Sequence, residues 1–244
     1  MTQTVVIVGL GEVGRPLLEI MKGRYQTFGV DINQPVSTSQ CDVMHICFPF
    51  ESGKFVGQVV EYIHQYRPAL TVINSTVAPG TTRSIATESS TPVVHSPVRG
   101  KHAGMQEELM HYAKFVGALD LVSGQRAVEH FEGVGMKTKL LTSPEASEIA
   151  KLTETTYFGL LIAWAQEVER YCMKLGVKYD EVASFYDEIR FFPRVKYFPG
   201  VIGGHCVMPN IAILRQQFPS GLLEAIVKSN TLKQKNLDSD GWLE

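Results

Sequence analysis

Two short glycine-containing motifs place chemically useful residues near the two ends of the sequence. Residues 9–14 read GLGEVG, which is the pattern G-x-G-x-x-G. Residues 203–206 read GGHC, so a thiol lies two residues after a pair of glycines that let a backbone approach a ligand closely. A thiolate is a strong nucleophile when a nearby cation lowers its pKa. The first motif indicates phosphate binding and the second a candidate nucleophile, Cys206, for which a buried structural thiol is the alternative interpretation.

The glycine motif at residues 9–14 has the context that a dinucleotide fingerprint requires. It follows a β-branched run at residues 4–8, opens a helical pattern, and is followed by Asp31 about 20 residues after Gly11. The Asp31 carboxylate can accept hydrogen bonds from ribose hydroxyls and would repel a 2′-phosphate, so we expect NAD rather than NADP. The alternative is a Rossmann-like domain that binds no cofactor. The residues expected here at the cofactor are Gly9, Leu10, Gly11, Glu12, Val13, Gly14, Asp31 and Ile32.

Strand and helix patterns alternate along the first 140 residues. This alternation predicts an α/β fold with a doubly wound, mostly parallel sheet. Strands are expected at 4–8, 26–30, 43–48, 70–74, 92–95, 114–116 and 138–141, and helices at 12–22, 53–65, 81–89 and 125–133.

The pattern changes at Ser143, where a serine, a proline and an acid in succession indicate a helix start. Except for Gly159, nothing interrupts the helical pattern before Gly176, so one long helix is expected. The following helices are expected at 179–185, 210–217 and 221–235, with an ordered loop at 191–209. The predicted organisation is a Rossmann domain at 1–142, an all-helical region at 143–236 that mediates dimerisation, and a polar tail at 237–244.

Composition excludes several classes of protein. The net charge of −2 leaves no basic excess for nucleic acid. The longest apolar runs are far shorter than the roughly 20 residues of a membrane span. The four cysteines form no C-x-x-C pair or zinc pattern, so we expect no metal site and a reduced, cytoplasmic protein.

Five segments, taken together, resemble the UDP-glucose/GDP-mannose (nucleotide-sugar) dehydrogenases. They read HICFP at 45–49, STVAPGTT at 75–82, EIAKLTE at 148–154, PRV at 193–195 and PGVIGGHCVMP at 199–209. The resemblance spans nearly the whole chain, from about Val5 to Asn236. It implies that Phe48, Pro49, Ser75 and Thr76 lie beside the cofactor.

That family oxidises a primary alcohol to a carboxylate with two NAD molecules, so the resemblance implies roles for particular residues. Cys206 would attack an aldehyde intermediate and form a thioester, and Lys151 would stabilise oxyanions. Thr76 would help to hold the catalytic water and the cofactor. The long helix would form a homodimer interface. The expected substrate contacts, some from the resemblance and some from charge, are Arg99, Lys151, Arg194, Gly203 and His205.

Three departures from the family pattern bear on this expectation. The lysine's usual partner, an asparagine four residues later, is replaced by Thr155, which keeps one hydroxyl donor. Val98 stands where one branch of the family has a glutamate, and His102 could supply acid–base function in its place. The sequence also ends where the family's second Rossmann-like domain, which binds the nucleotide of the sugar substrate, would begin. We therefore expect a smaller substrate or a second chain that completes the site.

Three hypotheses of different classes follow. The first is an NAD-dependent dehydrogenase that uses Lys151 and Cys206, either for one step or through to the carboxylate. The second is a single-step alcohol or hydroxyacid dehydrogenase in which Cys206 is incidental. The third is a non-catalytic or partner-completed NAD-binding protein. We favour the first.

Overall fold

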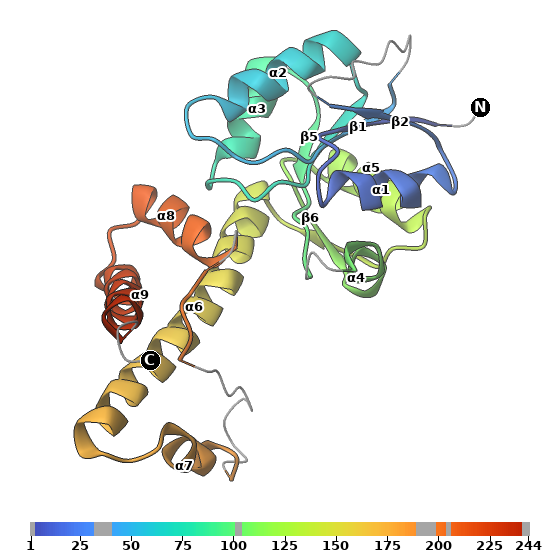
Figure 1. The fold of residues 1–244 in the computed structure, drawn as a ribbon. Coiled ribbons are helices and arrows are strands. Elements are labelled where there is room, and N and C mark those ends of the chain that lie inside the picture. Colours follow the sequence, from blue (N-terminus) through green and yellow to red (C-terminus); the bar gives the residue numbers. More distant parts are fainter. Residues whose placement is uncertain (1–2, 32–40, 101–103, 189–198, 204–205, 241–244) are drawn as a thin grey trace. The chain divides into compact units, whose positions relative to one another are not determined.

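The computed structural model describes residues 3–31, 41–100, 104–188, 199–203 and 206–240 (Figure 1). The chain divides into two compact units, Met1–Lys151 and Leu152–Glu244, and the division falls within one long helix.

The first unit contains a seven-stranded sheet in the order β2-β1-β3-β4-β5-β6-β7. Neighbouring strands are parallel except β5 and β6, which are antiparallel. The strands are β1 (Thr4–Val8), β2 (Gln26–Val30), β3 (Val43–Ile46), β4 (Leu70–Ile73), β5 (Val93–His95), β6 (Lys114–Ala118) and β7 (Thr138–Leu141). The helices among them are α1 (Gly14–Lys22), α2 (Phe55–Tyr66), α3 (Thr81–Ser89), α4 (Met105–His111) and α5 (Leu121–Glu132).

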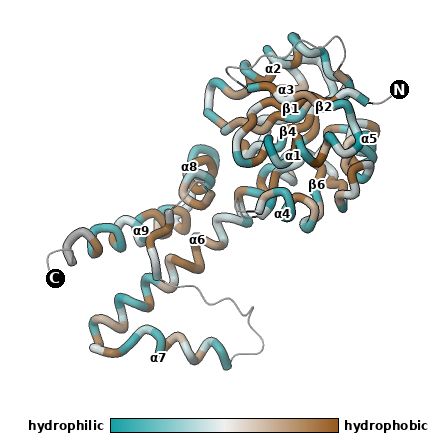
Figure 2. The backbone as a smooth tube through the Cα atoms, turned by 45° about the vertical axis from the view of Figure 1, so that its right-hand side comes forward, coloured by the Kyte–Doolittle hydropathy of each residue, from teal (hydrophilic) through white to brown (hydrophobic). Residues whose placement is uncertain are grey.

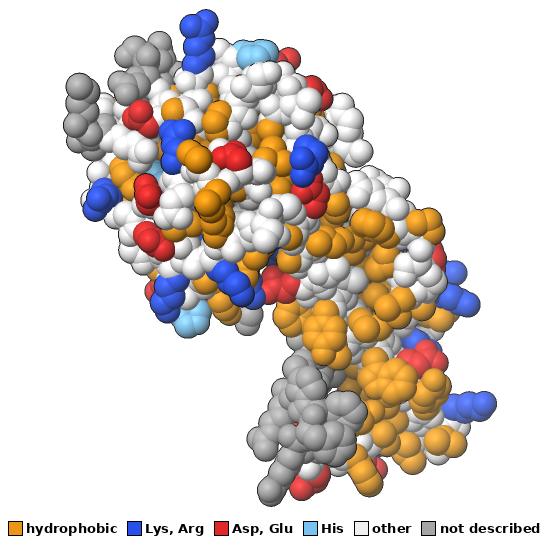
Figure 3. All heavy atoms as spheres, turned by 180° about the vertical axis from the view of Figure 1, so that it is seen from behind, with side chains coloured by type: hydrophobic (Ala, Val, Ile, Leu, Met, Phe, Trp, Pro, Cys, Tyr) orange, Lys and Arg blue, Asp and Glu red, His pale blue; other side chains and the backbone are white. Residues whose placement is uncertain are grey.

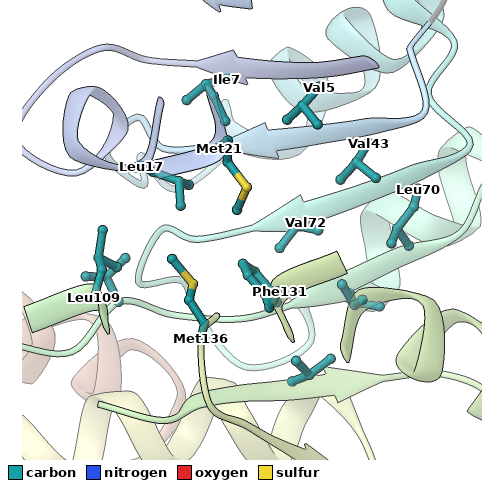
Figure 4. Close-up of a cluster of buried hydrophobic side chains, with 14 of the residues drawn as sticks. Val5, Ile7, Leu17, Met21, Val43, Leu70, Val72, Leu109, Phe131 and Met136 are labelled. Atoms are coloured by element: carbon teal, nitrogen blue, oxygen red, sulfur yellow. The ribbon is translucent and has the colours of Figure 1, made fainter. Parts of the chain in front are cut away.

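Helices cover both faces of this sheet, which confirms the predicted doubly wound α/β fold (Figure 1). Because side chains alternate along a strand, Val5 and Ile7 of β1 lie in one core and Val6 and Val8 in another. Helices α1, α4 and α5 pack on the first core, part of which is shown in Figure 4, and helices α2 and α3 pack on the second. Strands β1, β3 and β4 are buried along their whole length, as expected for strands covered on both faces, and hydrophobic segments are frequent in this unit in Figure 2.

The predicted elements differ from the structure mainly at their ends. Helix α4 was not expected from the sequence. Only Met105 and Leu109 of its seven residues are buried, so the helix is too short to show a repeating pattern of apolar residues. Helix α5 begins four residues before the expected start because Asp120 caps it, accepting a hydrogen bond from the Ser123 backbone N–H at 2.8 Å.

The second unit is helical. Helix α6 (Pro144–Leu175) enters it from the first unit and is followed by α7 (Tyr179–Ala183), the 3₁₀ turn η1 (Ser184–Tyr186), α8 (Val207–Gln217) and α9 (Gly221–Asp240). The predicted cap of α6 is confirmed, since Ser143 Oγ accepts from the Ala146 backbone N–H at 3.2 Å. Helix α8 begins three residues before the predicted start at Asn210, and α9 extends into the expected tail. No helix within the described residues has the length and apolar character needed to cross a membrane.

A chain of buried polar side chains crosses the sheet of the first unit. Lys114 Nζ donates to Asn74 Oδ1 at 3.2 Å and to the Ser96 carbonyl at 2.6 Å. The Asn74 amide nitrogen therefore faces His45 Nδ1, 3.0 Å away, and donates to it. His45 Nε2 must then carry the proton that it shares with His130 Nε2 at 2.9 Å.

These contacts hold both histidines neutral. His130 Nε2 accepts from His45, so its Nδ1 carries the proton and donates to Gln3 Oε1 at 3.0 Å. Burial lowers the pKa of His130 to about 4 and the pKa of His45 well below its usual value, the latter helped by repulsion from His130 and Lys114. Burial also lowers the pKa of His95, on strand β5 of the same sheet, to about 3.

The neutral histidines predict acid sensitivity of the fold. Their pKa values are about 6.5 in the unfolded chain and lower in the folded chain, so the unfolded state binds more protons in between. The free energy of unfolding should be highest above pH 6.5 and fall as the pH drops toward 4, by up to about 1.4 kcal/mol per pH unit for each histidine. Urea titrations at pH values from 7.5 to 4.5 measure this free energy of unfolding.

Two variants are compared with wild type. His130→Asn should reduce the pH dependence of the free energy of unfolding by the contribution of about one proton. His64→Ala, on the exposed surface of α2, should leave that pH dependence unchanged. Equal slopes for wild type and His130→Asn would contradict the assignment.

Candidate functional site

The glycine motif forms a turn between β1 and α1 that has no room for side chains at two positions. Gly9 has φ +90°, and a Cβ there would lie 2.8 Å from the Phe48 backbone nitrogen. A Cβ on Gly14 would lie 1.8 Å from the Gly9 carbonyl oxygen. By contrast, a Cβ on Gly11 would meet nothing within 4 Å. The turn therefore packs tightly through Gly9 and Gly14 and is open at Gly11, where the fingerprint expects a pyrophosphate.

The first turn of α1 lies at this open position. The helix begins at Gly14, and its N-cap residue, Val13, makes no side-chain capping hydrogen bond. The first backbone N–H groups of a helix have no partner within the helix and carry partial positive charge. These are the properties that a dinucleotide pyrophosphate requires, so the residues present here fit that ligand.

The other predicted cofactor residues follow the carboxyl ends of neighbouring strands. Asp31 follows β2, Phe48 and Pro49 follow β3, and Ser75 and Thr76 follow β4. Ser75 Oγ donates to the Phe48 carbonyl at 2.6 Å, which ties the chain after β4 to the chain after β3. The strand order reverses at β1, between β2 and β3, and ligands of open α/β sheets bind at such a switch point.

Helix α6 is fixed to this edge of the sheet by Glu148, which is fully buried. Its carboxylate accepts from the Gly80 N–H at 2.7 Å, the Thr82 N–H at 2.9 Å and the Thr82 hydroxyl at 2.6 Å. Burial raises the pKa of Glu148, and these three hydrogen bonds oppose that rise. Because Gly80 and Thr82 form the start of α3, the carboxylate both caps α3 and positions the first turns of α6.

Ser147 makes a second connection at the same edge. Its hydroxyl lies 2.7 Å from His95 Nδ1, and His95 Nε2 lies 3.1 Å from the Ser75 carbonyl oxygen. Since that carbonyl can only accept, the His95 proton is on Nε2, and the Ser147 hydroxyl donates to Nδ1. Lys151, half-buried and one turn after Ser147, is thereby held on the helix that contacts His95 and the start of α3.

In the second unit, Cys206 is exposed and forms the N-cap of α8. Asn210 lies one turn later, and its backbone N–H donates to the Cys206 carbonyl at 3.3 Å. The Asn210 side chain is buried and donates to Thr155 Oγ1 at 2.8 Å. An amide group thus reaches Thr155, the position at which the family resemblance expects an asparagine, from a different helix.

The remaining predicted site residues have varied positions. The Arg99 guanidinium lies over the rings of Tyr112 and Phe115, 5.2 and 5.5 Å from their centroids, so it stacks on aromatic neighbours of its own unit. Gly203 is exposed. Lys151 ends the first unit, whereas Thr155 and Cys206 belong to the second. Four further candidates lie outside the described residues: Ile32, His102, Arg194 and His205.

Several polar residues of the site were not predicted from the sequence. The buried contacts of Glu148, Ser147, His95 and Asn210 join segments distant in sequence, and no local pattern indicates such pairings. For Glu148 the signal was its place in the EIAKLTE segment, which indicated importance and gave no partner.

Comparisons with known proteins agree with this geometry. Residues 145–232 match the central domain of the UDP-glucose/GDP-mannose dehydrogenase family. The UDP-N-acetyl-D-mannosamine dehydrogenase of Methanocaldococcus jannaschii is 26% identical over 212 residues, covering 79% of this chain and 48% of that protein. These matches confirm the resemblance to the family. The chain spans about half the length of this curated relative.

Two solved structures have the same fold. The UDP-D-ManNAc dehydrogenase of Pyrococcus horikoshii superposes with a TM-score of 0.84 at 19% identity, covering 97% of this chain and 70% of that one. The 3-hydroxyisobutyrate dehydrogenase of Mycobacterium tuberculosis, solved with L-serine, gives a TM-score of 0.74 at 17% identity, covering 98% and 94%. At these identities the likeness establishes the fold and no finer property.

The turn geometry predicts different effects of two glycine substitutions on the unfolding midpoint. Gly14→Ala places a methyl group against the Gly9 carbonyl, so it should lower the unfolding midpoint by several degrees and loosen the turn. Gly11→Val has open space around its new side chain, so it should leave the midpoint unchanged.

If the open space is where a dinucleotide pyrophosphate lies, Gly11→Val should still weaken NADH binding at least about tenfold, because the side chain blocks close backbone approach. Fluorescence titration of both variants and of wild type measures the affinity. Unchanged NADH affinity in a stably folded Gly11→Val protein would show that the turn does not hold the cofactor.

Proposed function

We propose that this chain is an NAD-dependent oxidoreductase that oxidises a primary alcohol of a nucleotide sugar. The observation that carries the proposal is the turn at residues 9–14, closed at Gly9 and Gly14 and open at Gly11 beside an uncapped helix start. Asp31, at the end of the neighbouring strand β2, is positioned in sequence to accept hydrogen bonds from ribose hydroxyls. The M. jannaschii relative named above is a dehydrogenase of UDP-N-acetyl-D-mannosamine, and this supports the substrate class.

In this proposal the chain's residues bind and orient the reactants. The glycine turn, Asp31, Ile32, Phe48, Pro49, Ser75 and Thr76 hold the dinucleotide. Bound NAD supplies the hydride acceptor for each oxidation. Lys151 stabilises negative charge that develops on the substrate oxygen, and Thr76 orients the catalytic water. Arg99, Arg194, Gly203 and His205 remain proposed substrate contacts, and His102 a proposed acid–base group.

The second oxidation is proposed to use the thiol of Cys206. The thiolate adds to the aldehyde carbon, and loss of hydride from the adduct leaves a thioester between substrate and Cys206. Water attacks the thioester carbonyl, the C–S bond breaks, and the carboxylate and the thiolate are released. The exposure of Cys206 at the start of α8 supports this role because an aldehyde can reach the thiol. Thr155, hydrogen-bonded to Asn210, takes the place of the family's asparagine.

A second candidate function is a single-step hydroxyacid dehydrogenase. Its support is that nearly the whole chain shares its fold with nearly the whole of the 3-hydroxyisobutyrate dehydrogenase of M. tuberculosis. A partner-completed or non-catalytic NAD-binding protein is the third. The cytoplasmic location and the role in nucleotide-sugar metabolism stay predictions.

Replacing the thiol distinguishes the first two candidates. Cys206→Ala should abolish carboxylate formation, by more than about 10³-fold, because the thioester cannot form, while oxidation to the aldehyde persists. Mass spectrometry of the products, with NADH absorbance, measures both steps. Cys172→Ala, which removes a buried thiol in the same unit, should behave as wild type. Full carboxylate formation by Cys206→Ala would assign the chemistry to other groups.

We further propose that the chain forms a homodimer through α6. This helix exposes large apolar side chains, among them Tyr157, Phe158, Trp164 (53% exposed) and Tyr171. Hydrophobic side chains gather on the surface of the second unit in Figure 3. Exposed apolar area of this kind is typical of an interface.

Light scattering tests the dimer. Wild type should have twice the mass of the 27.1 kDa chain, and Trp164→Glu should shift it toward the monomer because a charge would be buried at the contact. A monomeric wild type would refute the interface.

A further inference from the structure

The segment that leads to Cys206 is held by two buried side-chain amides of the second unit. Asn230, on α9, contacts Ile202 twice: its Oδ1 accepts from the Ile202 backbone N–H at 2.7 Å, and its Nδ2 donates to the Ile202 carbonyl at 3.0 Å. Gln166, on α6, donates from Nε2 to the Gly200 carbonyl at 2.7 Å. The two helices therefore hold the backbone of Gly200 and Ile202 through three hydrogen bonds.

The orientation of the Gln166 amide is itself fixed. Its Oε1 accepts from the Ser229 hydroxyl at 2.8 Å, which leaves the Nε2 group to face Gly200. Gln166 is fully buried, and Asn230 and Ile202 are each 3% exposed. Buried polar groups are costly without partners, and here each carbonyl oxygen and amide nitrogen of the two side chains has one.

The chain after Cys206 is held independently. The Asn210 amide donates to Thr155 Oγ1 at 2.8 Å, and the absence of a side chain on Gly159 lets Val207 approach α6 closely. A Cβ on Gly159 would lie 2.7 Å from Val207 Cγ1. Cys206 thus lies between two anchored points, Ile202 four residues before it and Asn210 four residues after it.

We propose that Gln166 and Asn230 are positioning residues, which fix the Gly200–Ile202 backbone so that the Cys206 thiol is held at the start of α8. The role of that thiol rests on the proposed function. Leucine at either position would fill the space between the helices equally well. It could not hydrogen-bond to the backbone of the 200–202 segment and so could not fix the position of that segment. Paired amides can, because each hydrogen bond specifies one backbone group of the segment.

Three variants of α9 test this. Asn230→Leu removes both contacts with Ile202. Asn230→Asp keeps the acceptor, and its carboxyl group can donate to the Ile202 carbonyl only when protonated. Thr231→Ala is the matched control, because its exposed hydroxyl bonds only the Val227 carbonyl of its own helix among the contacts described.

The first measurement is hydrogen exchange of the Ile202 amide, expressed as a protection factor. Asn230→Leu should lower it at least about tenfold, and Thr231→Ala should leave it unchanged. Asn230→Asp should be close to wild type at pH 5 and lower at pH 8, because the carboxylate repels the Ile202 carbonyl. An unchanged protection factor in Asn230→Leu, or a protection factor that does not depend on pH in Asn230→Asp, would overturn the proposal that Asn230 fixes the Ile202 backbone.

The second measurement follows Cys206 and needs no substrate. The rate of alkylation of Cys206 by iodoacetamide, assigned by peptide mass spectrometry, should change at least about threefold in Asn230→Leu, because the thiol is no longer held in one position at the start of α8. Thr231→Ala should match wild type. Equal alkylation rates alongside lost Ile202 protection would overturn the positioning role.

The third measurement separates this inference from the proposed function. If wild type forms a carboxylate, Asn230→Leu should lower the kcat of that step at least about tenfold with KM changed less than about twofold, because misplacement affects the reacting atoms. An unchanged kcat would overturn the positioning role and leave the proposed function standing. If wild type forms no carboxylate, the proposed function fails. The exchange and alkylation results then still decide whether Gln166 and Asn230 position the thiol.

Discussion

The close contact of Gly14 with the Gly9 carbonyl is the constraint on which the first unit depends. Where a Cβ would lie 1.8 Å from a carbonyl oxygen, only glycine allows β1 to turn directly into α1. That turn places the start of α1 at the carboxyl ends of the strands, next to Gly11, where a Cβ would meet nothing. A steric requirement at one residue therefore creates the position at which phosphate charge can be accommodated.

The same edge of the sheet is made rigid by polar contacts that bury a carboxylate and several imidazoles. Glu148 joins α6 to the start of α3, and Ser147 joins it to His95 and so to Ser75. In the second unit, amides of Gln166, Asn230 and Asn210 hold the backbone on both sides of Cys206. Each unit thus uses hydrogen-bonded buried polar groups to position the residues that we propose for chemistry.

The sequence predicted the fold well because its strongest signals are local. Strands buried on both faces are continuous apolar runs, and the glycine motif specifies a turn whose geometry follows from the missing side chains. Helix α4 was missed because only Met105 and Leu109 of its residues are buried. Strand β6 was located, but no sequence pattern indicated that it would run antiparallel to β5.

The site was predictable only where a motif determines its own neighbours. The strands that precede Asp31, Phe48 and Ser75 lie where the sequence predicts them, and the contact of these residues with a cofactor stays a prediction. The partners of Thr155 and of the 200–202 segment were not predicted, because Asn210, Gln166 and Asn230 lie on helices whose pairing follows from tertiary packing. In the sequence alone, each of these three residues looks like an ordinary polar residue on a helix surface.

The most direct test of the central claim is the number of NADH molecules formed for each molecule of product acid. Purified protein is mixed with NAD and a panel of UDP-sugars, GDP-sugars and simple hydroxymethyl compounds, and NADH absorbance is followed together with product mass. The account predicts two NADH for each carboxylate from a nucleotide sugar. One NADH for each aldehyde or ketone, with no acid formed, would contradict the thioester route. No turnover of any compound, despite NADH binding, would contradict the assignment of this chain as a dehydrogenase that acts on its own.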